Sequence, residues 1–231
     1  MMIPKALILT LLMIALISTV QCSDERGYVV SIGDSVPNFD LELANGASLT
    51  MRDLKGNVIM LQFTASWCSV CRREMPHIER DIWRPYEKFG LRVIGIDRDE
   101  PIETVKIFAK ETRITYPLAL DPGAEIFGLF AEKESGVTRN IIIDPQGKII
   151  FLTRLFDPIE FENMIQIIHA ELERSLIMQN EQLAHEISLM EAELSSEKDA
   201  NTLLSNEIDR VLENKIKLEN KLQNLRRIQT N

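Results

Sequence analysis

Two cysteines stand close together in the sequence TASWCSVCRREMP at residues 64–76, where only two residues separate Cys68 from Cys71. Such a pair serves as a redox dithiol, as half of a metal site, or as two inert core thiols. A structural zinc site takes two more ligands, usually a second Cys or His pair, and His77 is the only histidine near the motif. We therefore expect no metal and no other cofactor. Inert thiols are disfavoured because an exported protein tends to oxidise them.

The redox interpretation requires the pair to lie between a buried strand and the first turn of a helix. The apolar run NVIMLQF at residues 57–63 is typical of a strand buried on both faces, and a helix is expected from Cys68 to about Phe89. The free N–H groups and partial positive charge of a helix N-terminus favour a thiolate there. We therefore expect Cys68 to attack a substrate disulfide and Cys71 to resolve the mixed disulfide.

The elements that position this dithiol alternate between strand and helix over residues 38–158. Pro76 and Pro85 are expected to interrupt or kink the helix that follows the cysteines. The other predicted elements are a hairpin at 39–51, a strand at 91–96, a helix at 101–112 and a second hairpin at 140–153. This order, closed by a C-terminal helix, predicts an α/β fold: a three-layer α/β/α sandwich with an N-terminal β-hairpin.

The motif WCSVCRREMP resembles the active site of the thioredoxin superfamily, specifically of its exported TlpA/ResA-like thiol-disulfide oxidoreductases. The resemblance covers roughly residues 34–168 and implies a thioredoxin-like fold and disulfide reduction. It implies that Glu74 helps to handle protons beside the dithiol, that Pro76 kinks the helix, and that Trp67 contacts substrate. A solvated helix carboxylate is the alternative for Glu74.

Two positions depart from the pattern of this family. The loop that faces the dithiol usually contains a cis-proline, whereas Thr138 takes that position in GVTRN. Cis peptide bonds are essentially confined to proline, so we expect a trans bond and altered docking, with Thr138 and Arg139 assigned to substrate binding. Gln62 replaces the buried carboxylate of ordinary thioredoxins, which leaves proton transfer to Glu74 or water.

The missing proline keeps other functions open. Peroxiredoxins of the same superfamily also lack it and carry an arginine near this loop, so Arg139 could position a peroxide. Against that, Ala65 stands where they have a threonine. Copper carriers of the Sco type lack the proline too, but they space their cysteines differently. A coiled-coil scaffold with a vestigial thioredoxin domain is a further alternative, and the intact WCSVC motif argues against it.

The end of the chain has a pattern of its own. Residues 159–231 contain neither Gly nor Pro, and an apolar residue recurs every seven positions from Leu176 to Leu225, interrupted at Glu197. Such heptads are typical of a coiled coil. A single helix over 173–231, at about 1.5 Å per residue, would be far longer than the domain. We therefore expect it to pair with other copies as a homodimer or trimer. The alternative is a helix packed back on the domain.

The start of the chain predicts export. Residues 1–22 place Lys5 before an apolar run that ends at Cys22, which resembles a signal peptide with a bacterial lipoprotein box. The run is short for a membrane-spanning helix, although an uncleaved anchor is one alternative. The other alternative is cleavage that leaves Cys22 free or removes it. Lipidated Cys22 would place the protein in a Gram-negative cell envelope, in the periplasm or on the outer membrane.

The predicted domain organisation is a signal peptide at 1–22, a tether at 23–37, a thioredoxin-like domain at 38–172 and a coiled coil at 173–231. Of the 231 residues, 45% are hydrophobic and 26% charged, which is ordinary for a globular protein. The net charge of -9 argues against nucleic acid as a partner. The expected partners are protein disulfides, a membrane electron donor, the membrane and further copies of the chain.

Overall fold

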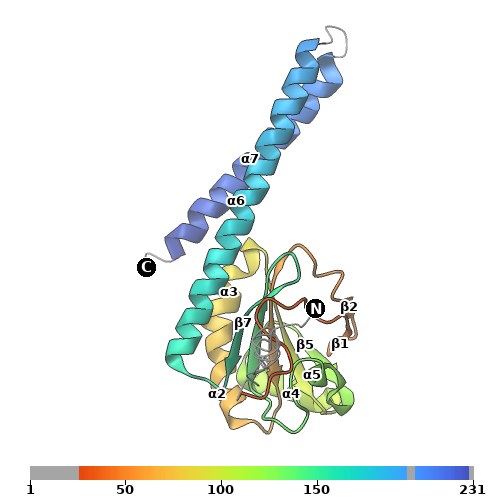
Figure 1. The fold of residues 1–231 in the computed structure, drawn as a ribbon, viewed down its shortest axis with the longest axis vertical. Coiled ribbons are helices and arrows are strands. Elements are labelled where there is room, and N and C mark those ends of the chain that lie inside the picture. The colour runs from red at the N-terminus through yellow and green to blue at the C-terminus, as the bar shows by residue number, and fades with distance from the viewer. Residues whose placement is uncertain (1–25, 197–200, 229–231) are drawn as a thin grey trace, which may run out of the picture.

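A computed structural model of the chain describes residues 26–196 and 201–228. Its centre is a mixed sheet of seven strands in the order β2-β1-β5-β4-β3-β6-β7 (Figure 1). The strands are β1 (Asp40–Leu43), β2 (Ser48–Thr50), β3 (Val58–Thr64), β4 (Leu91–Arg98), β5 (Leu118–Asp121), β6 (Arg139–Ile143) and β7 (Ile149–Arg154). The antiparallel pair β1–β2 forms the predicted N-terminal hairpin at one edge of the sheet.

Helices cover both faces of this sheet, which confirms the predicted three-layer sandwich. One face is covered by α2 (Ser69–His77), α4 (Ile102–Thr112) and the first part of α6 (Pro158–Ser196), and the other by α5 (Glu125–Gly128) and the N-terminal segment. On the α5 side, Phe63 packs edge-to-face on Phe127. Each face therefore has its own apolar core, and the central strand β3, buried along its whole length, contributes to both.

The position of the cysteines follows from the central strand. β3 runs parallel to β4 and antiparallel to β6, with Gln62 opposite Asn140. α2 begins five residues after Thr64, the last residue of β3, so Cys68 lies at the N-terminus of the helix. The expected order of buried strand, turn and helix is confirmed.

The helix after the cysteines is interrupted where its prolines predict. α2 contains Pro76 and gives way to a π-helical turn, η1 (Ile78–Trp83). The short α3 (Arg84–Tyr86), with Pro85, and η2 (Glu87–Phe89) complete it. Proline lacks the N–H of a regular helical bond, and π-helical turns often occur near functional sites.

The N-terminal segment differs from the predicted tether. Within residues 26–37, Val29 N–H donates to Phe130 O at 2.9 Å and Gly33 N–H to Ile149 O at 2.8 Å. Because Tyr28 is also buried, residues 26–37 belong to the domain, and a tether over 23–37 is wrong for that part. The predicted signal peptide and Cys22 lie outside the described residues. No helix in the described ranges is both long and apolar enough to cross a membrane.

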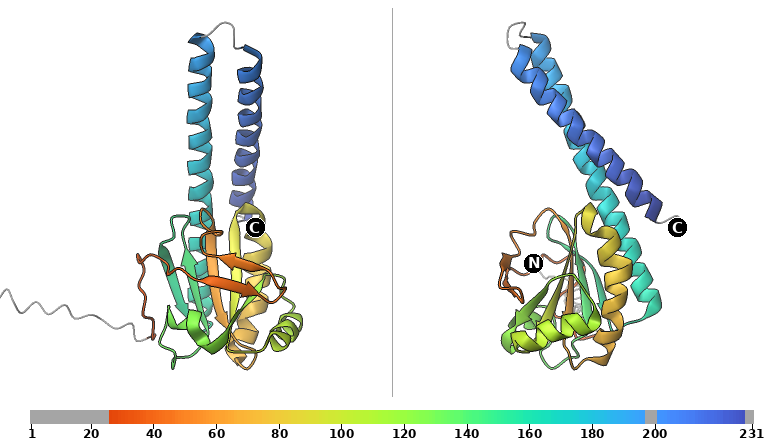
Figure 2. Two further views of the ribbon diagram at one scale, coloured as in Figure 1. Left: turned by 90° about the vertical axis from the view of Figure 1, so that its right-hand side faces the viewer. Right: turned by 180° about the vertical axis from the view of Figure 1, so that it is seen from behind.

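The C-terminal region also differs from the expected single helix. α6 ends at Ser196, and α7 (Asn201–Ile228) runs back alongside it as a hairpin that projects from the domain (Figures 1 and 2). Arg226 Nε donates to Glu173 Oε1 at 2.5 Å across the pair. The buried residues of the seam are Leu176, Ile187, Ile208, Val211 and Leu225. The heptads therefore pair within one chain, so the heptad pattern does not by itself require a second copy.

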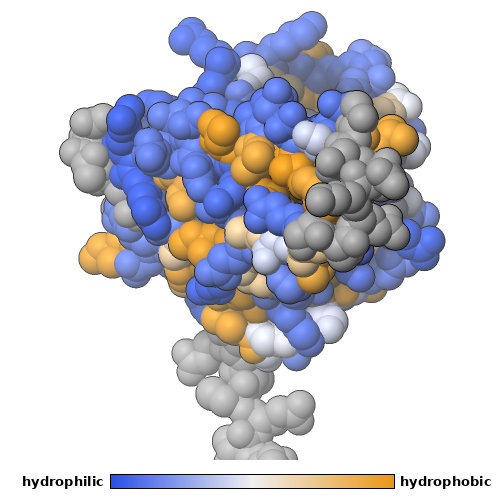
Figure 3. Space-filling model, turned by 90° about the horizontal axis from the view of Figure 1, so that it is seen from above, coloured by the Kyte–Doolittle hydropathy of each residue, from blue (hydrophilic) through white to orange (hydrophobic). Residues whose placement is uncertain are grey.

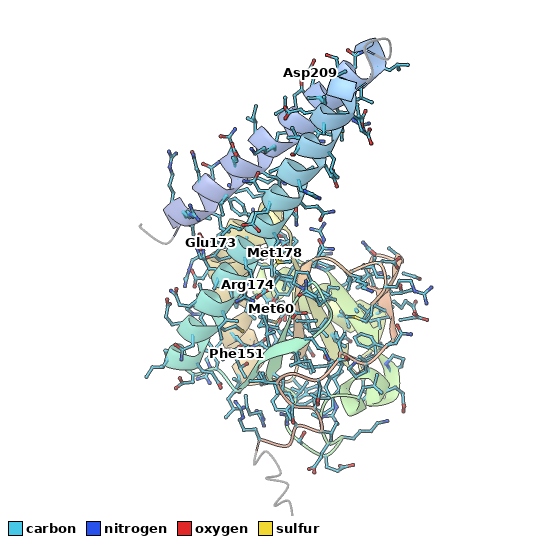
Figure 4. The ribbon with its side chains drawn as sticks, turned by 45° about the horizontal axis from the view of Figure 1, so that its top comes forward. Met60, Phe151, Glu173, Arg174, Met178 and Asp209 are labelled. Carbon is cyan, nitrogen blue, oxygen red and sulfur yellow. A yellow bond between two sulfur atoms is a disulfide. The ribbon has the colours of Figure 1, made fainter. Side chains whose placement is uncertain are left out.

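The predicted boundary between residues 172 and 173 falls inside a continuous helix. The first part of α6 packs on the sheet through Met164, Ile168 and Leu172. Glu173, Arg174 and Met178 follow on the same helix where it leaves the domain (Figure 4). One helix thus contributes to the core and then to the hairpin.

Candidate active site

The two cysteines form a disulfide at the start of α2, with their Cα atoms 5.3 Å apart. Cys68 is the N-cap of the helix, and its sulfur accepts a hydrogen bond from Cys71 N–H at 3.1 Å. Cys68 keeps 8% of its surface exposed, whereas Cys71 is completely buried. A substrate can therefore reach Cys68 first, and the helix N-terminus favours its thiolate.

Thr138 lies against both sulfur atoms. Its hydroxyl Oγ1 is 3.1 Å from Cys68 Sγ and 3.3 Å from Cys71 Sγ. Its carbonyl oxygen accepts a hydrogen bond from Leu155 N–H at 3.3 Å, and no peptide bond in residues 26–196 and 201–228 is cis. The position that usually carries a proline thus presents a hydroxyl that can donate to a thiolate.

Glu74 lies one turn beyond Cys71 and is only 1% exposed, so it is not a solvated helix carboxylate. Its Oε1 accepts a hydrogen bond from Asn140 Nδ2 at 2.6 Å, and its Oε2 accepts one from Gln62 Nε2 at 3.3 Å. Burial raises the pKa of Glu74 to about 7, although the two amides lower it. The carboxyl is therefore poised to take up and release a proton near neutral pH.

The two amides are themselves held in place. Tyr116 O–H donates to Gln62 Oε1 at 2.7 Å, and Asn140 Nδ2 also donates to Thr153 Oγ1 at 2.9 Å. The sequence alone did not predict Tyr116, Asn140 and Thr153 as residues of the site. A signal for Asn140 was present, because side chains alternate along a strand and Asn140 stands two residues after Thr138.

Arg139 and Trp67, which were both expected to contact substrate, lie in different environments. Arg139 is completely buried, donates from Nη2 to Ser135 Oγ at 2.8 Å and stacks 4.4 Å from the ring centroid of Tyr28. This position corrects its assignment to substrate binding and disfavours a role in holding peroxide. Trp67, by contrast, is 64% exposed beside Cys68.

The described residues contain no group of three or more His, Cys, Asp or Glu side chains that could hold a metal ion. The chemistry available at the site is that of the sulfurs, the Thr138 hydroxyl and the Glu74 carboxyl. A dithiol at a strand-to-helix turn, with one accessible and one buried cysteine, defines a thiol-disulfide oxidoreductase.

Comparison with known proteins agrees with this class. The model of the AhpC/TSA family matches residues 32–152, and the chain belongs to this family. The thiol-disulfide oxidoreductase ResA of Bacillus cereus strain ZK is 31% identical over 121 residues, which cover 52% of this chain and 68% of ResA. ResA of Bacillus subtilis strain 168 is 29% identical over 121 residues, covering 52% and 66% of the two chains.

Two solved structures share the fold. A candidate protein disulfide isomerase from Bacteroides thetaiotaomicron is 52% identical, with a TM-score of 0.62, and covers 63% of this chain and 92% of its own. A candidate thiol:disulfide interchange protein DsbE from Chlorobium tepidum is 27% identical, with a TM-score of 0.54, covering 62% and 99%. The fold is thioredoxin-like, and the protein is a thiol-disulfide oxidoreductase.

Proposed function

We propose that the protein reduces disulfides of other proteins outside the cytoplasm. The observation that carries this proposal is the disulfide at the N-terminus of α2, with Cys68 at the surface and Cys71 beneath it. The Cys68 thiolate attacks a substrate disulfide, forms a mixed disulfide and expels one substrate thiolate. Cys71 then attacks Cys68 Sγ and releases the second thiolate, so two electrons pass to the substrate. The reduction potential of the Cys68–Cys71 pair, measured at equilibrium with glutathione, tests the proposal.

Glu74 serves this cycle as the proton acceptor of Cys71. Buried Cys71 must lose its proton before it can attack, and a carboxyl with a pKa near 7 one turn away can accept it. Gln62 and Asn140 act as positioning residues, since each donates to one oxygen of Glu74. Pro76 lies in the same helix, α2, just before the π-helical turn η1, and has a structural role.

Substrate meets the protein around Cys68. Trp67 and Leu155 are exposed apolar side chains on the segments that flank the dithiol, and the Leu155 N–H bonds to the carbonyl of Thr138. An apolar contact of this kind suits a peptide segment of a protein substrate. The names of the ResA and DsbE relatives, which describe thiol-disulfide exchange, support protein disulfides as the substrate class.

Thr138→Val tests whether the hydroxyl stabilises the attacking thiolate. Valine keeps the shape but removes the donor, and a hydrogen bond to a charged group contributes about 1.5–3 kcal/mol. We expect the reduced variant to alkylate at Cys68 about tenfold more slowly with iodoacetamide at pH 7. Thr138→Ser, which retains the hydroxyl, should stay within about twofold of wild type. Equal rates in the valine variant and wild type would refute this role.

We further propose that residues 1–22 direct export and that Cys22 carries a lipid that anchors the protein to the outer membrane of a Gram-negative cell. The resemblance of the sequence to a lipoprotein box supports this proposal. A membrane electron donor would then regenerate the dithiol. The anchor is tested by palmitate labelling: wild type should incorporate palmitate and Cys22→Ala should not.

The hairpin of α6 and α7 is proposed as a coiled coil that joins copies of the chain. Two helices leave much of their seam uncovered, because Leu183, Met190 and Leu218 are only half-buried. Outside this seam, Ile216 is an exposed apolar side chain on α7. Seen from the hairpin end, apolar side chains lie among hydrophilic ones (Figure 3). Light scattering should give a molar mass greater than that of one chain, and Ile216→Asp should reduce this mass.

The thioredoxin-like domain is assigned to residues 26–176.

A further inference from the structure

Asp97 is a buried acid that the proposed cycle does not use. It is the second-last residue of β4, its side chain is completely buried, and neither of its carboxylate oxygens receives a hydrogen bond from the described part of the chain. Burial of an ionised carboxylate without a donor is costly. Its surroundings must therefore let it keep a proton.

Glu100 is the neighbour that explains why Asp97 can remain protonated. Its carboxyl lies within hydrogen-bond reach of Asp97. Its Oε2 accepts from Ser66 N–H at 2.5 Å and its Oε1 accepts from Ser66 O–H at 2.5 Å. Because Ser66 lies two residues before Cys68, in the turn between β3 and α2, the acid pair is connected to the backbone that carries the attacking sulfur.

Asp97 is buried and Glu100 is half-buried, and two adjacent acids in such a setting cannot both ionise cheaply. Burial, and then the charge of Glu100 and the hydrogen bond to it, raise the pKa of Asp97 to about 8. At neutral pH, Asp97 O–H therefore donates to Glu100, while the Glu100 carboxylate accepts from both donors of Ser66. This arrangement accounts for both oxygens of Glu100 and for the N–H and O–H of Ser66.

Arg72, the other charged residue that contacts Ser66, is already paired. Arg72 of α2 donates from Nε to Ser66 O at 2.5 Å and pairs through Nη1 with Glu111 of α4 at 2.7 Å. The neighbouring strands place uncharged Thr64 and Leu120 opposite Asp97. Glu100 is the one charged group that shifts the pKa of Asp97.

We propose that Asp97 and Glu100 form a proton-linked clamp on the turn that carries Cys68. Both are positioning residues. While Asp97 is protonated, Glu100 holds Ser66 and thereby the N-cap position of Cys68. When Asp97 loses its proton to solvent, two adjacent negative charges repel, the hold on Ser66 weakens, and the added charge disfavours a nearby thiolate. The inference rests on the proposed role of Cys68 as the attacking thiolate.

The test is the pH profile of Cys68 alkylation in the reduced full chain, measured with iodoacetamide from pH 6 to 10 by peptide mass spectrometry. Wild type should show a rise as the thiolate forms and a second inflection, downward, near pH 8. Asp97→Asn keeps a neutral donor to Glu100, so it should match wild type below pH 7 and lack the second inflection. Without the added negative charge near the thiolate, it should react at least about threefold faster at pH 9. Glu103→Gln, an exposed change on α4, should keep both inflections.

Two further variants separate proton linkage from simple support. Glu100→Gln and Ser66→Ala loosen the turn and should slow alkylation at every pH. An Asp97→Asn profile that coincides with wild type, or that is slow at every pH like Glu100→Gln, would overturn the clamp. Because alkylation needs no substrate, a protein that shows the predicted profile but reduces no disulfide would refute the proposed function and leave the clamp standing.

Stability gives an independent readout. Folded Asp97 holds its proton to about pH 8, whereas its ordinary pKa is 3.8, so the folded state binds more protons between these values. The free energy of unfolding of wild type should therefore fall as pH rises through this window. The free energy of unfolding of Asp97→Asn should fall less steeply with pH. An identical slope in both proteins would contradict a buried protonated Asp97.

Discussion

Cys68→Ser is expected to abolish disulfide reduction, with a loss on the order of 10³-fold or more in the rate of reduction of a disulfide-bonded protein such as insulin. Serine keeps the N-cap of α2 but lacks a nucleophilic thiolate, and Cys71 is completely buried and cannot replace it. Cys71→Ser should behave differently. It leaves Cys68 able to attack, so the variant should accumulate a covalent mixed disulfide that is visible by mass spectrometry.

The third cysteine provides a matched control, because Cys22 lies outside the predicted domain. Cys22→Ser, compared in detergent so that an anchor has no influence, should reduce insulin at the wild-type rate. Mixed disulfide in Cys68→Ser and none in Cys71→Ser would reverse the two roles. Full activity in Cys68→Ser would remove the dithiol from the reaction.

Glu74→Gln is expected to slow the cycle and to stabilise the fold. Without the carboxyl, Cys71 loses its nearby proton acceptor, and resolution of the mixed disulfide should slow by about 10²-fold. The initial attack by Cys68 should change little. Stopped-flow measurement of mixed-disulfide decay separates the two steps.

The stability effect follows from the raised pKa of Glu74, which is about 7 against an ordinary value of 4.5. Between these values the folded state binds more protons than the unfolded state, so the free energy of unfolding falls as pH rises, by up to about 3 kcal/mol. Glutamine removes this penalty but loses one accepted hydrogen bond, so we expect a gain of about 2 kcal/mol at pH 8.

Glu87→Gln is the matched control for this pair of effects, because Glu87 is exposed on η2. It should change neither the decay of the mixed disulfide nor the pH dependence of unfolding. A Glu74→Gln protein that resolves the mixed disulfide as fast as wild type would exclude Glu74 as the proton acceptor.

Local patterns predicted the centre of the molecule. The apolar run of β3, the cysteines that follow it and the helix kinked after Pro76 each depend on nearby residues, so their order was visible in the sequence. The position of Thr138 opposite the dithiol followed from the family resemblance. Its contact with both sulfurs needed the structure.

Long-range pairing explains what the sequence analysis did not find. A heptad pattern shows that a helix needs a partner, but it does not say whether that partner is another chain. The interruption of the heptads falls in the sequence between the last residue of α6, Ser196, and the first residue of α7, Asn201. Residues 26–37 dock through backbone bonds to distant loops and strands, which leave no periodic signal. The burial of Glu74 likewise depends on Asn140, far along the chain.

The reduction potential of the Cys68–Cys71 pair tests the central claim most directly. Equilibration in graded glutathione buffers, thiol trapping and mass spectrometry of the cysteine peptide give the fraction reduced at each potential. A reductase should have a value close to that of thioredoxin, about -270 mV, so that it gives electrons to substrate disulfides. A value close to that of DsbA, about -120 mV, or the lack of a reversible disulfide, would contradict the account.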